Sequence, residues 1–217
     1  MAALRVAFTP LPLARWGPLF HVLLLEQPGL RLEWVTTSFP RRDRPLLEGA
    51  DVGLFIEPPP EPGLRTLVVG TSPMAVVMAV GHRLAGDHEL RIADVLDEPF
   101  PEGADQHPRW RAFWTLDAYR GGPPRRSHAE AVDPDAGLRA IVAGDAIATF
   151  PLALADGLPH PGVIALPLVD GPAVTTRLVW RAGETHDAVH ALVDIARDMF
   201  GGRELAGDRP GPDWLAA

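Results

Sequence analysis

The chain of 217 residues contains no cysteine and no lysine, and each absence removes a class of function. Without cysteine there is no disulfide, no thiolate metal site and no thiol nucleophile. All basic side chains are arginines, dispersed apart from short groups at 41–44 and 125–126. The net charge is −8, whereas a nucleic-acid-binding surface normally carries an excess of basic residues. We therefore expect this chain to make no direct contact with nucleic acid.

Catalytic and cofactor-binding motifs are also scarce. The only serines are Ser38, Ser72 and Ser127, and none lies in a Gly-x-Ser-x-Gly elbow. There is no glycine-rich phosphate loop of the Walker or dinucleotide-binding type. His186 and His190 have the spacing of a two-histidine metal pair, but no third ligand is identifiable. We expect no catalytic residue, no metal and no cofactor.

The sequence shows neither a signal peptide nor a membrane span. Residues 1–5 lack the charged segment and the apolar run of a secretory signal. The apolar run Phe20–Leu25 is far too short to cross a bilayer. Together with the missing cysteines, these features lead us to expect a cytoplasmic protein with no membrane partner.

What the chain does contain is an alternation of strand and helix patterns. Leu4–Phe8, Leu30–Val35 and Asp51–Ile56 are predicted strands, and Trp16–Leu25 is a predicted helix. Strands separated by helices indicate parallel pairing with right-handed crossovers, and therefore an α/β fold. Further strands are predicted at 64–69, 74–80, 98–101, 126–132, 146–150, 163–168 and 175–181, and helices at 92–96, 110–119, 133–143, 152–155 and 187–200.

The order of these elements indicates two α/β lobes, one inserted in the other. Lobe I is predicted to contain residues 1–75 and 176–217, and lobe II residues 76–175. The polar tail 203–217 contains proline and glycine and is expected to be mobile. Ligands in open α/β sheets bind at the carboxyl ends of the strands, so the sequence predicts a ligand site where those ends meet.

Six short segments, in this order and spacing, resemble the effector-binding domain of LysR-type transcriptional regulators. They are 4–8, 28–33, 47–54, 81–84, 96–100 and 142–148. The resemblance covers Leu4 to Phe200 and implies a type II periplasmic-binding-protein-like fold, with two Rossmann-like lobes joined by two crossover strands. It implies a small-molecule effector bound in the cleft between the lobes, association into a homodimer or higher homo-oligomer, and contact with DNA through an N-terminal helix-turn-helix. No such segment precedes Leu4, and the expectation is an excised domain rather than a stand-alone protein.

The resemblance also implies where the effector lies, namely just after the strands of each lobe. The implied ligand-binding residues are Thr9, Pro10, Thr36, Thr37, Ser38, Glu57, Phe100, Pro101, Thr149 and Phe150. Hydroxyls beside free backbone N–H groups can hold a carboxylate or phosphate oxygen. The alternative for Thr37 and Ser38 is that they only cap a helix.

Two features depart from the family pattern. Relatives that bind acids carry a basic residue near Glu57, whereas a carboxylate would repel an anion unless it is protonated or paired. Glu57 therefore favours a neutral or cationic effector, and the alternative is a solvent-facing side chain. Pro40 and Pro45 predict that the helix expected between the second and third strands is irregular.

Two other functions share this fold. A solute-binding protein that feeds a transporter is one, although the missing signal peptide argues against it. An enzyme of the dehydratase or menaquinone-pathway type is the other. It would need a catalytic group in the cleft, for which Thr36, Thr37 and Glu57 are the only candidates.

Overall fold

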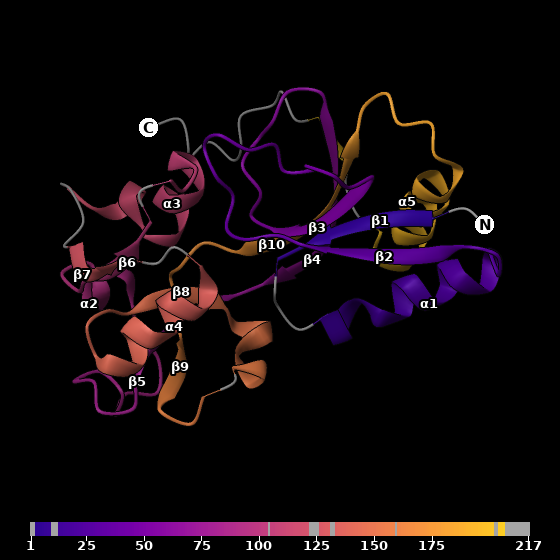
Figure 1. Cartoon of the computed structure of the whole chain (residues 1–217). Coiled ribbons are helices and arrows are strands. Elements are labelled where there is room, and N and C mark those ends of the chain that lie inside the picture. Colours follow the sequence, from indigo (N-terminus) through magenta and orange to yellow (C-terminus); the bar gives the residue numbers. More distant parts are fainter. Residues whose placement is uncertain are drawn as a thin grey trace. The chain divides into compact units, whose positions relative to one another are not determined.

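The structure, a computed structural model, describes residues 3–9, 13–103, 105–121, 126–130, 133–158, 160–201 and 204–206. The chain divides into two compact units (Figure 1). Unit 1 contains the chain up to Ser38, Arg44–Thr71 and the chain from Thr175 onward, and unit 2 contains Phe39–Asp43 and Ser72–Val174. The assignment of lobes at 1–75, 76–175 and 176–217 stays a prediction, as does the mobile tail, most of which lies outside the described residues.

Unit 1 is built on a six-stranded sheet in the order β11-β4-β10-β3-β1-β2. Strand β1 pairs in parallel with both β2 and β3, as the strand–helix alternation predicts, and β10 is antiparallel to β3. The strands are β1 (Ala3–Phe8), β2 (Arg31–Thr36), β3 (Val52–Ile56), β4 (Leu64–Ser72), β10 (Val174–Arg181) and β11 (Glu204–Ala206).

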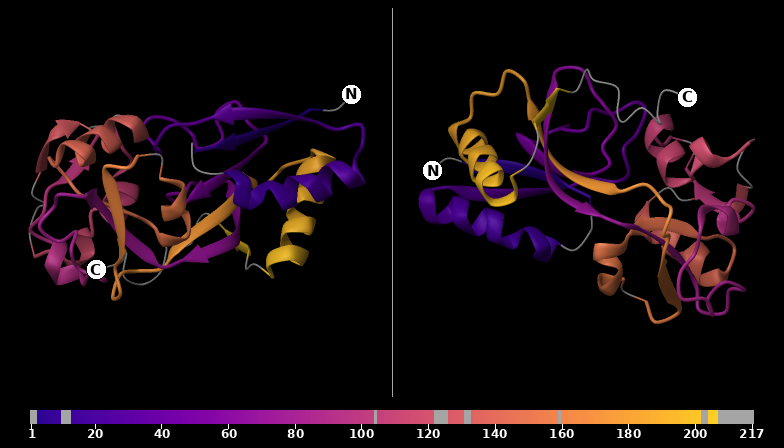
Figure 2. Two further views of the ribbon diagram at one scale, coloured as in Figure 1. Left: turned by 90° about the horizontal axis from the view of Figure 1, so that it is seen from below. Right: turned by 180° about the vertical axis from the view of Figure 1, so that it is seen from behind.

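Two helices, α1 (Gly17–Glu26) and α5 (Asp187–Phe200), pack on one face of this sheet and form the main core with it. Both views in Figure 2 show α1 (indigo) beside α5 (yellow). The short helix η1 (Leu13–Trp16) leads into α1, and Gly201 ends α5 with a φ of 58° that favours glycine. Leu4 and Val6 on β1 are two residues apart, so both side chains point to the face of the sheet that α1 and α5 cover, and both are buried there.

The opposite face of the sheet is covered by a segment without regular helix. Leu46, Leu47 and Ala50 pack there against Phe55 and Val179. Residues 37–51, all of which the structure describes, contain no helix, which confirms the effect expected of Pro40 and Pro45. Arg181 holds the segment in place, because its guanidinium donates to the carbonyls of Ala50 (2.8 Å) and Leu47 (2.9 Å).

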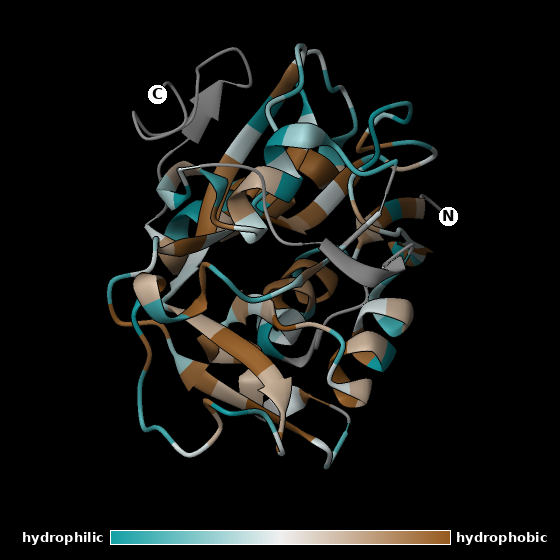
Figure 3. Cartoon of the chain, turned by 90° about the vertical axis from the view of Figure 1, so that its left-hand side faces the viewer, coloured by the Kyte–Doolittle hydropathy of each residue, from teal (hydrophilic) through white to brown (hydrophobic). Residues whose placement is uncertain are grey.

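Unit 2 is centred on β5 (Met74–Ala79), which is almost completely buried and pairs antiparallel with β8 and β9. Figure 3 shows hydrophobic residues (brown) concentrated along the strands and hydrophilic residues (teal) in the connecting loops. The remaining elements of this unit are α2 (Ile92–Val95), β6 (Phe100–Glu102), α3 (Pro108–Trp114), η2 (Asp117–Tyr119), β7 (Arg126–Glu130), α4 (Pro134–Ala143), β8 (Ala148–Pro151), η3 (Leu152–Gly157) and β9 (Val163–Pro167).

Helix α4 begins and ends as the sequence predicts. The Asp133 carboxylate accepts a hydrogen bond from the Ala136 N–H at 2.7 Å, and Pro134 occupies the first turn. Gly144 ends the helix with a φ of 80°, in the left-handed region.

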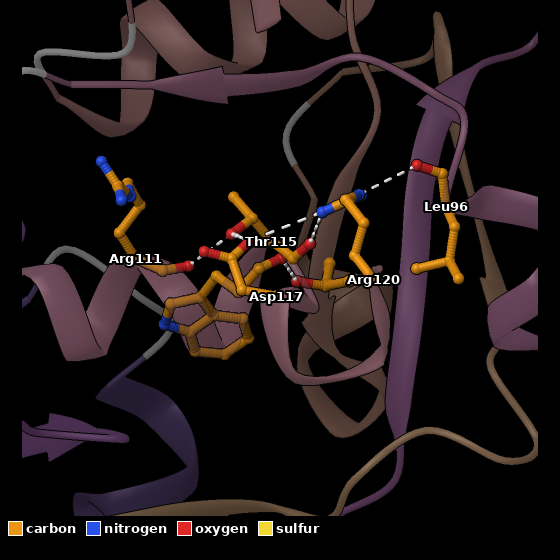
Figure 4. A network of polar contacts seen from close by, with 7 residues as sticks. Leu96, Arg111, Thr115, Asp117 and Arg120 are labelled. Carbon is orange, nitrogen blue, oxygen red and sulfur yellow. Dashed lines mark hydrogen bonds and ion pairs between the residues drawn. The ribbon is translucent and has the colours of Figure 1, made fainter. Parts of the chain in front are cut away.

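The helix predicted over 110–119 is wrong in its second half, because α3 ends at Trp114 and Leu116 adopts a φ of 59°. Arg120 stabilises the turn that replaces it, donating to the carbonyls of Thr115 (2.6 Å) and Leu96 (3.1 Å) (Figure 4). The Thr115 hydroxyl lies 2.7 Å from an Asp117 carboxylate oxygen. These polar contacts to the backbone compete with continued helix.

The segment Phe39–Asp43 packs with unit 2 although its neighbours in sequence belong to unit 1. The Pro40 carbonyl accepts from the His107 N–H at 2.8 Å, and the Arg41 guanidinium donates to Asp105 at 2.8 Å. The Phe39 ring lies against the Trp110 ring, with centroids 4.9 Å apart. The chain therefore passes between the units at residues 38–39 and 43–44, besides 71–72 and 174–175.

Candidate functional site

The parallel strands of unit 1 bring several of the predicted ligand-binding residues to one edge of its sheet. Phe8 on β1 is in register with Thr36 on β2 and with Leu54 on β3, so the three strands end side by side. Thr9 follows β1, Thr36–Ser38 end and follow β2, and Glu57 follows β3. Pro10 lies outside the described residues. This edge, which we call the strand-end site, is where an open α/β sheet binds its ligands.

Thr37 has the most unusual environment at the strand-end site. Its N–H donates to the Phe8 carbonyl at 2.9 Å, which extends the pairing of β1 with β2 by one residue. Its hydroxyl oxygen is buried and has no hydrogen-bond partner among the residues that the structure describes. Thr36 and Ser38 on either side are exposed. The capping interpretation of Thr37 and Ser38 is wrong, because no helix follows them before α2.

Glu57 is held by a partner that the sequence did not indicate. Its carboxylate accepts hydrogen bonds from the N–H and from the hydroxyl of Thr175, the latter at 2.7 Å, and its own N–H donates to the Thr175 carbonyl at 2.9 Å. Arg177 Nε in turn donates to the Thr175 hydroxyl at 3.0 Å. The solvent-facing alternative for Glu57 is therefore wrong, and its carboxylate fastens the end of β3 to the start of β10.

Burial raises the pKa of Glu57 above its ordinary value of 4.5, because removing the carboxylate from water disfavours the charged form. The hydrogen bonds from Thr175 and the positive charge of Arg177 oppose this effect and lower the pKa. The backbone of Glu57 has a φ of 45°, which is uncommon for a residue with a side chain. The charge and conformation of Glu57 are thus both set by its local environment.

In unit 2, the implied ligand residues lie on β6 and β8, which start side by side because the Ile147 N–H donates to the Pro99 carbonyl at 2.9 Å. Phe100 is 1% exposed, and the Arg120 guanidinium lies 5.3 Å from its ring centroid. Thr149 is 6% exposed and donates its hydroxyl to the Trp114 carbonyl at 2.5 Å. Phe100 and Thr149 are thus engaged within unit 2, whereas Pro101 and Phe150 are half-buried.

An aromatic group beside Thr149 contains a second buried donor. The rings of Trp110 and Trp114 lie 5.9 Å apart, and those of Phe113 and Trp114 lie 5.0 Å apart in an edge-to-face arrangement. The indole Nε1 of Trp114 is buried and has no partner in the described part of the chain. The sequence indicated a core or interface face here. The missed signal is that Trp carries a donor which normally finds an acceptor when buried.

The two histidines with metal-pair spacing make contacts with the backbone. His186 Nε2 lies 3.0 Å from the Ala3 carbonyl oxygen and its Nδ1 accepts from the Ala188 N–H, whereas His190 Nε2 lies 3.0 Å from the Glu184 carbonyl oxygen. Within the described residues, no three side chains of the metal-binding types are gathered where they could hold an ion. Nor does any described helix combine the length and hydrophobicity needed to cross a bilayer.

Comparison with known proteins gives one family across almost the whole chain. The LysR substrate binding domain family matches residues 2–201. A curated relative, the HTH-type transcriptional regulator ShiR of Corynebacterium glutamicum (strain R), is 31% identical over 181 residues. The match covers 80% of this chain and 60% of the relative, so the chain spans less than two thirds of the length of that protein.

Solved structures show the same fold. The effector binding domain of a BenM variant superposes with a TM-score of 0.72 at 16% identity, covering 93% of this chain and 95% of that one. The CcmR regulatory domain of Synechocystis PCC6803, solved in complex with 2-PG, gives 0.71 at 18% identity over 92% of this chain and 98% of that one. These similarities confirm the α/β, type II periplasmic-binding-protein-like fold, and the match over residues 2–201 shows that the chain belongs to the family of LysR substrate-binding domains.

Proposed function

We propose that this chain is the effector-sensing domain of a LysR-type transcriptional regulator and that the Thr37 hydroxyl contacts the effector. The observation that carries the proposal is the buried Thr37 hydroxyl at the strand-end site, which has no hydrogen-bond partner in the part of the chain that the structure describes. Buried hydroxyls in folded proteins are almost always hydrogen-bonded, and an exception calls for a missing partner. A polar group of a bound small molecule is such a partner.

The energetics of burying a hydroxyl support the same role. A buried hydroxyl without a hydrogen bond costs about 1–3 kcal/mol, and this cost is recovered when a ligand supplies the bond. Thr9, Thr36 and Ser38 supply further hydroxyls at the ends of the neighbouring strands β1 and β2. Glu57 also follows this edge, but its carboxylate already accepts two hydrogen bonds from Thr175. We therefore assign recognition to the hydroxyls, with Glu57 as a structural support.

The same geometry favours binding over catalysis. Of the three candidate catalytic residues, Glu57 is the only one that could act as a base, and it is occupied by Thr175. Relatives named as transcriptional regulators support a non-catalytic function. The direct check is to incubate the protein with a bound compound and recover it by chromatography. Recovery of a converted product would refute the non-catalytic proposal.

Thr37→Val tests the proposal because valine keeps the shape of threonine and removes the hydroxyl. Thermal shift would first identify a ligand from a panel of small anionic, neutral and cationic compounds that includes benzoate and 2-PG, the ligands named for BenM and CcmR. We expect Thr37→Val to weaken binding of that ligand about tenfold in calorimetry, and Thr37→Ser to retain most of the affinity. The free Thr37→Val protein should be at least as stable as the wild type, because it no longer buries an unpartnered hydroxyl.

A matched control is Thr185→Val, at an exposed loop position after β10, which runs antiparallel to β3 and so ends at the opposite edge of the sheet from the strand-end site. It should leave both affinity and stability unchanged. Wild-type affinity in Thr37→Val would show that the hydroxyl does not contact the ligand and would refute this placement of the site.

We also infer that the domain forms a homodimer or a higher homo-oligomer. Unit 1 exposes three large apolar side chains on α1 and β2, namely Leu24 (38% exposed), Leu25 (66%) and Trp34 (45%). The Trp34 ring packs edge-to-face on Phe20 of α1 at 5.0 Å, so the two elements form one surface. Contiguous exposed apolar surface marks association sites, and we infer that Leu24, Leu25 and Trp34 contribute to one. Sedimentation should give a dimer or larger species, and Leu25→Glu with Trp34→Glu should give a monomer.

A further inference from the structure

The segment Phe39–Asp43, which we call the strap, packs with unit 2, whereas the chain on both sides of it is anchored in unit 1. Before the strap, the Thr37 N–H donates to the Phe8 carbonyl of β1 at 2.9 Å. After the strap, the Leu46 N–H donates to the Glu61 carboxylate at 3.0 Å. The strap therefore links the backbone of the strand-end site directly to unit 2.

The backbone of the strap pairs with a loop of unit 2. The His107 N–H donates to the Pro40 carbonyl at 2.8 Å, and the Arg42 N–H donates to the Asp105 carbonyl at 3.0 Å. These two hydrogen bonds lie on either side of an isolated antiparallel bridge. The strap thus adds to unit 2 in the way that a short strand adds to a partner strand.

Two side-chain contacts reinforce this pairing. The Arg41 guanidinium donates to the Asp105 carboxylate at 2.8 Å, and the centroids of the Phe39 and Trp110 rings lie 4.9 Å apart. The Asp105 side chain is 68% exposed, so the ion pair contributes only weakly. A segment held by two backbone bonds, an exposed ion pair and one ring contact opens locally more easily than the units unfold.

Pro40 and Pro45 favour the docked strap. Proline fixes its own φ and keeps the residue before it extended, here Phe39 and Arg44. These positions have fewer conformations to lose on docking than a chain without proline would have. The two prolines that prevent a helix after β2 thus also prepare the extended strap.

We propose that the strap holds the Thr37 hydroxyl in its binding position, with Asp105 and Trp110 of unit 2 as positioning residues. Thr37 lies two residues before Phe39, a span of at most about 7 Å. Movement of the strap away from unit 2 therefore loosens the hydrogen bond of the Thr37 N–H. The role of the strap in ligand binding rests on the proposed function of Thr37, whereas its docking on unit 2 does not. Because coupling is reciprocal, a ligand held by Thr37 stabilises the docked strap.

Amide hydrogen exchange of the ¹⁵N-labelled full chain, followed by NMR, tests this coupling without a ligand. The reporters are the N–H groups of Thr37, Arg42 and His107. The references are the N–H groups of Asp51 in unit 1 and Ile147 in unit 2, both bonded to backbone carbonyls outside the strap contacts. Substitutions at positions 105 and 110 leave the sequence neighbours of all these amides unchanged. A faster rate therefore reports easier opening and no change in intrinsic exchange.

The three reporters should respond together. Asp105→Asn should speed their exchange about threefold, the effect of an exposed ion pair. Trp110→Leu should speed it about tenfold through loss of the ring contact with Phe39. Asp105→Glu keeps the carboxylate and should stay close to the wild type. The matched control is Asp145→Asn, which removes an exposed aspartate of unit 2 outside the strap contacts and should change no rate. The reference amides should exchange as in the wild type throughout, because the opening is local.

Three results would overturn the proposal. Unchanged exchange of Arg42 and His107 in both Asp105→Asn and Trp110→Leu would show that these residues do not hold the strap. Equal acceleration in Asp105→Asn and Asp105→Glu would refute the role of the ion pair. Faster exchange of Arg42 and His107 with an unchanged rate at Thr37 would show that the strap docks without positioning Thr37. The proposed function fails by a different result, wild-type ligand affinity in Thr37→Val, which leaves the exchange pattern of the strap as predicted.

Discussion

Three substitutions of Glu57 separate the energy of its hydrogen bonds to Thr175 from the energy of its left-handed backbone. Glu57→Ala removes the acceptor for the Thr175 N–H and hydroxyl and keeps a side chain at a φ of 45°. Glu57→Gly removes the same acceptor but places glycine at that φ. Glu57→Gln keeps an acceptor oxygen and removes the charge. Comparing Glu57→Gly with Glu57→Ala therefore isolates the backbone cost, and comparing Glu57→Gln with the wild type isolates the charge.

A buried hydrogen bond contributes about 0.5–1.5 kcal/mol net to stability, and Glu57 accepts two such bonds from Thr175. We expect Glu57→Ala to lower the free energy of unfolding by about 2 kcal/mol at about pH 4, where the contribution of Glu57 is fully present. Left-handed backbone costs an ordinary residue about 1–2 kcal/mol. Glycine avoids this cost but loses about 0.5–1 kcal/mol of chain entropy, so Glu57→Gly should be about 0.5–1 kcal/mol more stable than Glu57→Ala.

Urea denaturation followed by circular dichroism measures these differences, provided that the slope of unfolding free energy with urea is the same in all variants. If Glu57→Ala were as stable as the wild type, the bonds to Thr175 would contribute nothing to folding. If Glu57→Gly were less stable than Glu57→Ala, the left-handed conformation of residue 57 would be refuted.

The raised pKa of Glu57 adds a dependence on pH. Between the ordinary value of 4.5 and the higher pKa in the folded protein, the folded chain binds more protons than the unfolded chain. The contribution of Glu57 to the free energy of unfolding is therefore fully present below pH 4.5 and is lost as the pH rises through the folded pKa. Relative to Glu57→Gln, the wild type should lose stability as the pH rises above 4.5. A relative gain over this range would mean that Thr175 and Arg177 outweigh burial.

Three further substitutions probe the packing around the sites, each measured by urea denaturation. Gly53→Ala should lower the free energy of unfolding by about 1–3 kcal/mol, because its Cβ would lie 2.1 Å from Phe55 Cε2. Adding Phe55→Leu should restore part of the lost stability. A Gly53→Ala variant as stable as the wild type would contradict the close packing of Gly53 on Phe55. Asp133→Ala should lower the free energy of unfolding by about 1 kcal/mol, because α4 loses its N-cap, and Asp133→Asn should be nearly as stable as the wild type. An equal loss of stability in both variants would mean that the negative charge of Asp133, and not its hydrogen bond to the Ala136 N–H, stabilises the helix. Phe100→Ala should cost about 3–5 kcal/mol, and a smaller loss would show that Phe100 is not buried in the core of unit 2.

The elements that the sequence predicted well are those with a strong local cause. The long amphipathic pattern of α5 and the glycine after it fixed both ends of that helix at Asp187 and Phe200. The prediction of a helix over 110–119 failed because its apolar spacing continues past Trp114. The interruption comes from the Arg120 guanidinium and the Thr115 hydroxyl, which donate to backbone carbonyls. Polar side chains that compete for backbone groups leave no trace in the spacing of apolar residues.

At the strand-end site, the sequence predicts which residues come together but not which of their side chains are already hydrogen-bonded. Parallel pairing places Thr9, Thr37 and Glu57 at one edge, and parallel pairing follows from the order of strands and helices. Which side chain there keeps a free polar group depends on partners distant in sequence. Glu57 and Thr175 are 118 residues apart, and their bond occupies the one carboxylate that the sequence had weighed as a ligand contact. The Thr37 hydroxyl has no hydrogen-bond partner among the residues that the structure describes, and this makes it the first residue to test with a ligand.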